Sequence, residues 1–216
     1  MEQVFTITFI TGLLAAMMRM ATPIIFGTLG EILSERAGVL NLGIEGIMLM
    51  GAMTGFLTTL TTGSLWLGVA AAALVGALLA LFMAFLAVYL GLSQHVSGLG
   101  ITLFSTGLAM FIYQLSVGSP VNPPTVRPFT QAAIPFLSEI PVIGPAFFTQ
   151  YTLVYWAFLL IPALWVLLYR TTWGLAIRTV GENPLAADTV GINVNLVRTL
   201  CLAAGGALMG IGGAFL

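Results

Sequence analysis

Long apolar stretches alternate with short polar ones along the whole chain. The apolar stretches cover residues 5–29, 39–60, 65–90, 96–117, 151–169 and 199–216. Most of them are close to the length of about 20 residues that a helix needs to cross the hydrocarbon core of a bilayer. Within a stretch the apolar residues face every direction, whereas the strands of a membrane barrel alternate apolar and polar residues. The pattern predicts an all-α fold, a polytopic membrane-embedded helical bundle with about six transmembrane helices.

The composition excludes an ordinary soluble domain. Hydrophobic residues make up 59% of the 216 residues and charged residues only 6%. Between Glu45 and Arg127 the chain contains no Asp, Glu, Lys or Arg for 81 residues. The net charge of −1 gives no reason to expect a nucleic-acid partner. The sequence lacks metal-ligand spacing, a P-loop and a nucleophile elbow, so we expect no metal, no cofactor and no catalytic residues.

Two polar regions interrupt the later part of the chain. Residues 118–150 hold seven prolines, which rules out a regular span and predicts an extracytoplasmic loop with one short element on the membrane. Residues 170–198 form the only sustained hydrophilic loop. With six spans, four arginines lie on the side of this loop and Arg127 lies on the other, so the loop belongs in the cytoplasm. The N-terminus is then outside, unless another span precedes it or residues 30–46 are re-entrant.

A cluster of charges interrupts the apolar pattern near the start. Residues 30–51, GEILSERAGVLNLGIEGIMLMG, hold four of the thirteen charged residues, namely Glu31, Glu35, Arg36 and Glu45. A carboxylate inside a membrane is a functional candidate by default because its burial is costly. The alternative is that the first three form a short polar loop and only Glu45 is immersed.

The same stretch carries the signs of a helix break. Asn41 and Glu45 are four residues apart and share one face if the helix is continuous. The glycines at positions 38, 43 and 46 also permit an unwound turn, and broken helices at membrane depth lie where backbone lines a cavity or is buried in protein. We therefore predict a single transmembrane domain over residues 1–216, with a broken or re-entrant helix near residues 38–46. The candidate residues of a translocation pathway are Asn41, Glu45, Glu31, Gln94 and His95.

Two further polar side chains need partners or an interfacial position. Arg19 lies within the first apolar stretch, where Glu31 or Glu45 could pair with it, unless the helix is offset and Arg19 reaches the headgroups. For His95 the alternative to a pathway role is an interfacial position at a helix end. Pro23 predicts a kink that is packed in protein, because neighbours must compensate for the carbonyl that it frees.

Small residues predict where the helices approach closely. Ala72, Gly76, Ala80 and Ala84 recur every four residues in the third stretch, and Gly206 and Gly210 lie in the last one. Such spacing favours close helix packing in membranes. The last stretch stops at Leu216 without a polar flank, so we expect the chain to be the front part of a longer protein.

The hydrophilic loop contains a short helix with both of its caps. Asn183 suits the N-cap, Pro184 the first helical position and Gly191 the residue after the end, which predicts a helix over residues 184–190. This helix displays Leu185, Ala186 and Val190. Because an isolated helix of two turns is unstable in water, it must dock on the membrane surface or on a partner protein.

Three segments resemble a known family of transport proteins. They are GEILSERAGVLNLGIEGIMLMGA, the GSPVN at residues 118–122, and TTWGLAIRTVGENPLAADTVGINVN at residues 171–195. Their order and spacing resemble the permease subunits of bacterial ABC importers of the simple-sugar, branched-chain amino acid and nucleoside class. The first segment is most similar to the nucleoside branch, and the third resembles the cytoplasmic coupling loop of sugar and nucleoside members.

The resemblance implies a subunit without chemistry of its own in the bacterial inner membrane. Two permeases, identical or different, would form the pathway for a nucleoside or simple sugar. A separate ATP-binding subunit would hydrolyse ATP, and an extracytoplasmic solute-binding protein or lipoprotein would deliver the substrate. The coupling residues it implies are Gly181, Glu182, Asn183, Pro184, Leu185, Ala186, Ala187 and Gly191.

Other classes of membrane protein remain open at this point. A secondary transporter would use Glu45 as a coupling-ion site and would run without an ATPase. A branched-chain amino acid permease of the same importer class would carry a different substrate. A channel or structural subunit would show no saturable uptake. The capped helix favours the importer, because a free-standing carrier does not require it.

Overall fold

The computed structural model describes residues 7–118, 124–133, 135, 138 and 143–216. Its elements in chain order are α1 (Ile7–Arg36), α2 (Ile44–Thr62), α3 (Leu65–Ala84), the π-helical turn η2 (Phe85–Tyr89), α4 (Gln94–Ser116), β1 (Gln131–Ala133), α5 (Ile143–Phe147), β2 (Thr149–Tyr151), α6 (Thr152–Arg170), α7 (Thr172–Glu182), α8 (Pro184–Thr189) and α9 (Val194–Phe215). Within the described residues six helices are long and apolar enough to span a membrane: α1, α2, α3 with η2, α4, α6 and α9. The predicted polytopic helical bundle is confirmed.

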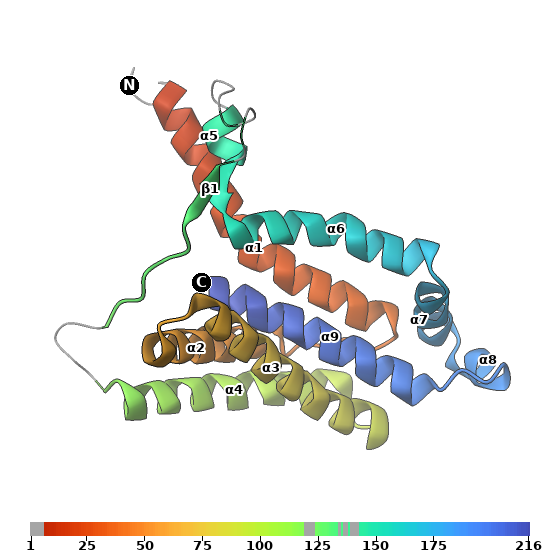
Figure 1. Ribbon diagram of the computed structural model, residues 1–216. Coiled ribbons are helices and arrows are strands. Elements are labelled where there is room, and N and C mark those ends of the chain that lie inside the picture. The colour runs from red at the N-terminus through yellow and green to blue at the C-terminus, as the bar shows by residue number, and fades with distance from the viewer. Residues whose placement is uncertain (1–6, 119–123, 134, 136–137, 139–142) are drawn as a thin grey trace.

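Helix α9 is the centre of the bundle. It lies between α1 and α6 on one side and α2, α3 and α4 on the other (Figure 1), and it packs directly against α1, α2 and α3. The predicted small-residue ridge is confirmed, because all four of its residues are buried and α3 meets α9 along it. A methyl group added at Gly206 would meet the Gly76 carbonyl oxygen, and one at Gly210 would meet the Ala72 carbonyl oxygen. The two backbones therefore touch, as close packing in membranes requires.

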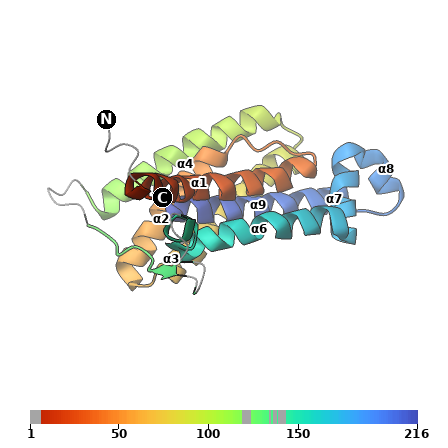
Figure 2. The same cartoon turned by 90° about the horizontal axis from the view of Figure 1, so that it is seen from above.

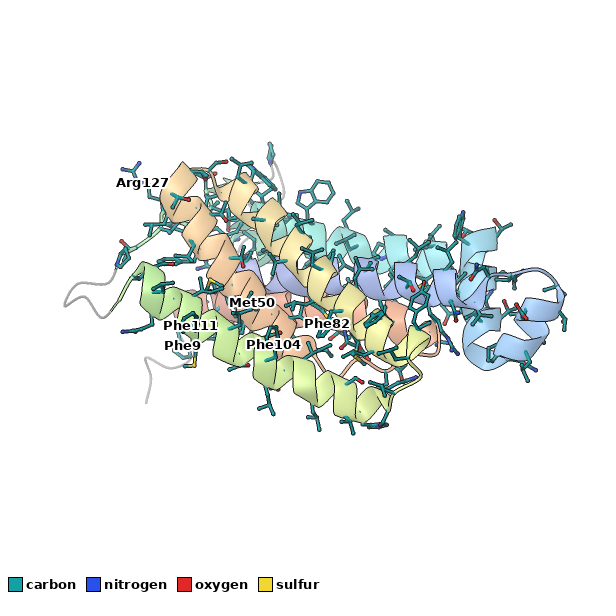
Figure 3. The ribbon with its side chains drawn as sticks, turned by 90° about the horizontal axis from the view of Figure 1, so that it is seen from below. Phe9, Met50, Phe82, Phe104, Phe111 and Arg127 are labelled. Carbon is teal, nitrogen blue, oxygen red and sulfur yellow. The ribbon has the colours of Figure 1, made fainter. Side chains whose placement is uncertain are left out.

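The outer faces of the bundle are apolar. Figure 3 labels Phe104 and Phe111 on α4 and Phe82 on α3, and all three side chains are exposed on the surface of the chain. A soluble protein rarely exposes such continuous apolar surface, whereas a bilayer covers it with lipid. Pro23 is buried in α1, as predicted for a proline packed in protein.

An apolar cluster closes one end of the bundle. Figures 1 and 2 show α7 and α8 at the end of the bundle that lies away from the start of α1 and from the C-terminus. Buried residues of α1, α6, α7, α8 and α9 meet there, namely Leu33, Leu168, Ile177, Val180, Ala187, Val197 and Cys201, together with Ala37 just after α1. We call this set the end cluster. Four of the arginines, Arg36, Arg170, Arg178 and Arg198, lie on the elements that meet here, and we call this the arginine-rich end.

The opposite end carries the proline-rich excursion. In its described part β1 and β2 pair antiparallel, with Gln131 opposite Tyr151, and α5 precedes β2. The side chain of the fully buried Gln150 accepts a hydrogen bond from Arg19 Nε at 3.2 Å, and the Arg19 guanidinium also lies 5.2 Å from the centre of the Tyr151 ring. The expectation that Glu31 or Glu45 pairs with Arg19 is therefore wrong. Both partners of Arg19 come from the excursion, 131 and 132 residues away in sequence.

Several helix boundaries differ from the sequence prediction. Helix α1 continues to Arg36, so the alternative in which Glu31, Glu35 and Arg36 form a loop is wrong. Helix α9 begins at Val194, because Asn193 accepts a hydrogen bond from Leu196 N and caps it there. The amphipathic helix α7 was not predicted. Its N-cap Thr171 accepts from Gly174 N at 3.0 Å, and its buried positions recur every three residues.

Candidate functional site

A non-helical segment, residues 37–43, joins α1 to α2 inside the bundle, and we call it the buried break. Helix α1 ends where Gly38 adopts a positive φ of 84°, a conformation that favours glycine. Arg198 Nε donates to Ala37 O at 3.2 Å, and Asn41 Nδ2 lies 3.8 Å from Met209 Sδ. The segment therefore lies along α9, between the part of the helix that the Arg198 side chain reaches from and Met209. The predicted break is present, but it covers residues 37–43 instead of 38–46, because α2 already begins at Ile44.

Two side chains predicted for the pathway satisfy the backbone of the buried break. Leu40 N donates to Gln94 Oε1 at 2.9 Å, and Gln94 Nε2 donates to Gly38 O at 3.4 Å. Asn41 N donates to Glu31 Oε1 at 2.9 Å. An unpaired backbone group inside a membrane costs about 2 kcal/mol or more, so these bonds stabilise the non-helical conformation of the segment.

Asn41 and α4 complete the support of the buried break. The Asn41 side chain is fully buried, and its Oδ1 accepts from Gly43 N at 2.9 Å. Thr102 Oγ1 of α4 donates to Leu42 O at 3.0 Å. A methyl group added at Gly98 would lie 2.9 Å from Leu42 N, so glycine is needed for α4 to approach this closely. Four elements, α1, α4, α9 and the segment itself, hold the break in one shape.

Two polar atoms beside the buried break are buried without a hydrogen-bond partner among the described residues. They are Glu31 Oε2 and Ser105 Oγ. Ser105 faces α2 at Gly46, where an added methyl group would lie 3.1 Å from its Cβ. Buried polar atoms in folded proteins are nearly always satisfied, and an exception calls for an explanation such as a ligand or water. The Glu31 carboxylate oxygen and the Ser105 hydroxyl can form hydrogen bonds with a solute that carries hydroxyl or amide groups.

The structure separates the five predicted pathway residues into two sets. Glu31, Asn41 and Gln94 come together, whereas Glu45 and His95 are exposed and outside this group. Asn41 and Glu45 would share a helical face only in a continuous helix, and the structure has the unwound alternative, because α2 begins only at Ile44. Glu45 lies in the first turn of α2, whose Gly43 N-cap gives no side-chain bond. A carboxylate there interacts favourably with the helix dipole.

Some residues around the buried break were not predicted. Thr102 and Ser105 are two of several hydroxyl residues in the apolar stretch of α4, and nothing in their spacing distinguishes them. Arg198 entered the sequence analysis only as a charge that orients the chain. A lone polar residue in a membrane helix was the only available signal, and it does not say which backbone it meets.

The predicted helix of the hydrophilic loop forms at the arginine-rich end as α8. Asn183 Oδ1 accepts from Ala186 N at 3.0 Å, Pro184 is the first helical residue, and Gly191 has a φ of 84°. The helix ends at Thr189, one residue before the predicted end. Leu185 is 80% exposed and Val190 75%, and Ala186 is exposed beside them. Figure 1 shows α8 as the outermost element of this end.

The remaining loop residues anchor α8 to the bundle. Ala187 is only 2% exposed and belongs to the end cluster, so it faces inward and does not belong to the displayed surface. Gly181 of α7 packs against the backbone of Arg36 and Gly38, which ties α7 to the start of the buried break. Glu182 is exposed at the end of α7. The α8 loop, residues 183–193, is thus anchored to the bundle through Ala187, while Leu185, Ala186 and Val190 remain exposed.

The chain resembles known transport proteins over most of its length. Residues 13–216 match the family model described as branched-chain amino acid transport system / permease component. The chain belongs to this permease family. A putative glucose ABC transporter permease of Haloferax volcanii is 42% identical to this chain over 213 residues. These residues cover 97% of this chain and 63% of that relative.

Two bacterial relatives carry nucleoside names. A guanosine ABC transporter permease of Bacillus subtilis is 40% identical over 203 residues, covering 89% of this chain and 63% of that protein. A nucleoside ABC transporter permease of Lactococcus lactis is 38% identical over 210 residues, covering 94% and 66%. The permease therefore spans about two thirds or less of the length of these relatives. The comparison with solved structures gave no match.

Proposed function

We propose that the permease is the membrane-spanning subunit of an ATP-driven importer that carries a nucleoside or a simple sugar. The names of the relatives in Haloferax, Bacillus and Lactococcus support this substrate class. A separate ATP-binding subunit supplies the energy, a solute-binding protein or lipoprotein delivers the solute, and a second permease, identical or different, completes the pathway. The arginine-rich end faces the cytoplasm of a bacterial inner membrane, in keeping with the positive-inside rule.

The observation that carries this proposal is the exposed surface of α8. Leu185 and Val190 expose large apolar side chains at the tip of a helix that is capped at both ends and held by Ala187 beneath. Apolar side chains at a well-ordered tip are typical anchors of a protein interface. We assign this surface to a groove of the ATP-binding subunit.

We assign the buried break to the translocation pathway of the solute. Glu31, Asn41 and Gln94 hold an extended backbone at membrane depth, and Glu31 Oε2 remains available as an acceptor. Non-helical backbone inside a membrane occurs where it lines a cavity or is buried in protein, and unpaired polar atoms beside this segment favour the first role. The alternative with Glu45 as a coupling-ion site has less support, because Glu45 is exposed and apart from these residues.

Charged replacements on α8 test the coupling role. Leu185→Glu and Val190→Glu each place a charge on the exposed tip, so the permease should insert and fold normally. Loss of one interface anchor costs about 2 kcal/mol or more, so ATPase stimulation by loaded binding protein and solute uptake should fall by about tenfold or more. The control is Thr125→Glu, which places the same charge on an exposed site at the opposite end.

The reconstituted complex gives a clear contrary outcome. If both α8 variants retain normal ATPase stimulation and normal uptake, α8 does not couple the two subunits. A loss of uptake in all three variants, control included, would likewise remove the support for this surface.

A further inference from the structure

Three arginine side chains gather on two aromatic rings at the arginine-rich end. The guanidinium carbons of Arg36 and Arg178 lie 5.8 Å and 5.0 Å from the centre of the Tyr169 ring. That of Arg170 lies 5.5 Å from the centre of the Trp165 ring, and the two rings are 6.2 Å apart. The side chains come from the ends of α1 and α6 and from the middle of α7. Three positive charges are therefore concentrated within a small area at the end of the bundle.

These charges are not neutralised within the described part of the chain. None of the three arginines forms an ion pair with a described carboxylate. Arg178 Nε donates to Gly174 O at 3.4 Å, and the other guanidinium donors of the three arginines form no hydrogen bond within the described part of the chain. Two exposed carboxylates lie on the same helices, Glu35 beside Arg36 and Glu182 at the end of α7. The three arginines thus keep free donors for an anion with several oxygens.

An apolar groove leads away from this cluster toward the middle of the membrane. It lies between α1 and α6 and has a volume of about 340 Å³. Its apolar wall consists of Leu29, Ile32, Ile161, Leu164 and Leu168. Trp165, Tyr169 and Glu35 also line the groove, together with Arg36 of the three arginines. From Ile161 to Tyr169 the groove follows α6 for about 12 Å, which is close to the depth of one leaflet.

We propose that this groove binds an anionic phospholipid. The headgroup phosphate lies on the Arg36 and Arg178 guanidinium groups, and one acyl chain fills the apolar groove between α1 and α6. The order of apolar wall, aromatic rings and arginines matches the order of acyl chain, interface and phosphate in a lipid leaflet. The proposal does not depend on the identity of the transported solute.

Fluorescence quenching tests the site directly. Trp165 is 50% exposed in the groove, so it can report a lipid beside it once Trp66, Trp156 and Trp173 are changed to Phe. The complete permease is reconstituted with brominated phosphatidylglycerol or brominated phosphatidylcholine in an excess of the unbrominated lipids. Each nearby arginine favours an anionic lipid by about 1 kcal/mol, so phosphatidylglycerol should bind at least about fivefold more tightly. The preference should shrink at high salt.

Paired substitutions separate charge from fold. Arg36→Gln combined with Arg178→Gln should remove the preference for phosphatidylglycerol. Arg36→Lys combined with Arg178→Lys keeps both charges and should retain most of it. Arg127→Gln, at the opposite end, is the matched control and should change nothing. Glu35→Gln removes the carboxylate beside the groove and should raise the preference about twofold.

Several outcomes would overturn the lipid site. Equal quenching by both lipids in the parent protein would show that the headgroup is not recognised. Absence of quenching by either lipid would show that protein covers the groove. If the double glutamine variant keeps the preference for phosphatidylglycerol, the arginines have another role. The same holds if the only defect of that variant is loss of the ATP-binding subunit.

Discussion

The buried break and the α8 loop are both short departures from long helices, yet they are held in opposite ways. The α8 loop is held mostly by its own residues, since Asn183 caps α8 and Gly191 ends it within eight residues of sequence. The buried break is held by side chains that are distant in sequence, 161 residues for Arg198 on Ala37 and 54 residues for Gln94 on Leu40. One is a local structure that offers a surface to a partner. The other exists only when α1, α4 and α9 are assembled around it.

This difference has a functional meaning. A self-capped helix keeps its shape while it is pressed against or released from another protein, because its hydrogen bonds do not depend on the rest of the bundle. The buried break can change shape only if α1, α4 and α9 move, because their side chains satisfy its backbone. Motions of the bundle would therefore reach the polar atoms of the pathway directly, and Gly181 links α7 to the same segment.

The largest expected effect comes from removing a distant partner of the buried break. Gln94→Leu leaves Leu40 N and Gly38 O without their partner inside the bundle. Each unsatisfied group costs about 1–3 kcal/mol, so the free energy of unfolding should fall by about 2–5 kcal/mol. The measurement is unfolding of the purified permease in mixed detergent micelles. The neighbouring His95→Leu is the control, because His95 is exposed and its loss should change stability by less than about 0.5 kcal/mol. Equal effects of both changes would mean that the break is not held by Gln94.

A charge placed on the buried face of α8 should destabilise the protein more than the same charge on its exposed face. Ala187→Glu places a carboxylate in the end cluster, where the side chain is 2% exposed, whereas Leu185→Glu places it in the open. Because α8 can swing away instead of burying the charge, the loss for Ala187→Glu should be about 2–3 kcal/mol. Leu185→Glu should stay within about 0.5 kcal/mol in the same unfolding assay. If Ala187→Glu is as stable as the parent protein, α8 is not docked on the bundle.

The smallest effect concerns the cap of α8. Asn183→Ala removes the acceptor of Ala186 N and should cost about 1 kcal/mol, which speeds hydrogen exchange in α8 about fivefold and leaves the bundle unchanged. Asn193→Ala removes the equivalent cap of α9, but that helix is fixed by packing along its length, so only its first turn should exchange faster. Protection that drops throughout the bundle in Asn183→Ala would show that the α8 loop is not locally held.

The same contrast explains what could be predicted from the sequence. The caps of α8 act over three to eight residues, so Asn183, Pro184 and Gly191 indicated the helix, and the small-residue ridge of α3 likewise has a local period. The position of the buried break was also predictable, because its glycines and charges interrupt an apolar run. Its partners were not, because the pairing of Gln94 with Leu40 or of Arg19 with Gln150 depends on how separate helices pack. The two-stranded pairing of β1 and β2 was missed for a similar reason, since strands of three residues carry too short a pattern.

The glycines of α9 also constrain how the protein can be made. Methyl groups added at Gly205, Gly206 and Gly213 would meet backbone oxygens of α1, α3 and α2 respectively, so α9 is the shared neighbour of three helices that precede it. Among the described helices it is also the last to leave the ribosome. Helices α1 and α2 hardly touch each other, so before residues 194–215 enter the bilayer α1 can pack only against α5, α6 and α7. We expect the growing chain to wait in the membrane with its glycine faces open to lipid, dependent on the insertion machinery and vulnerable to membrane proteases, until α9 arrives.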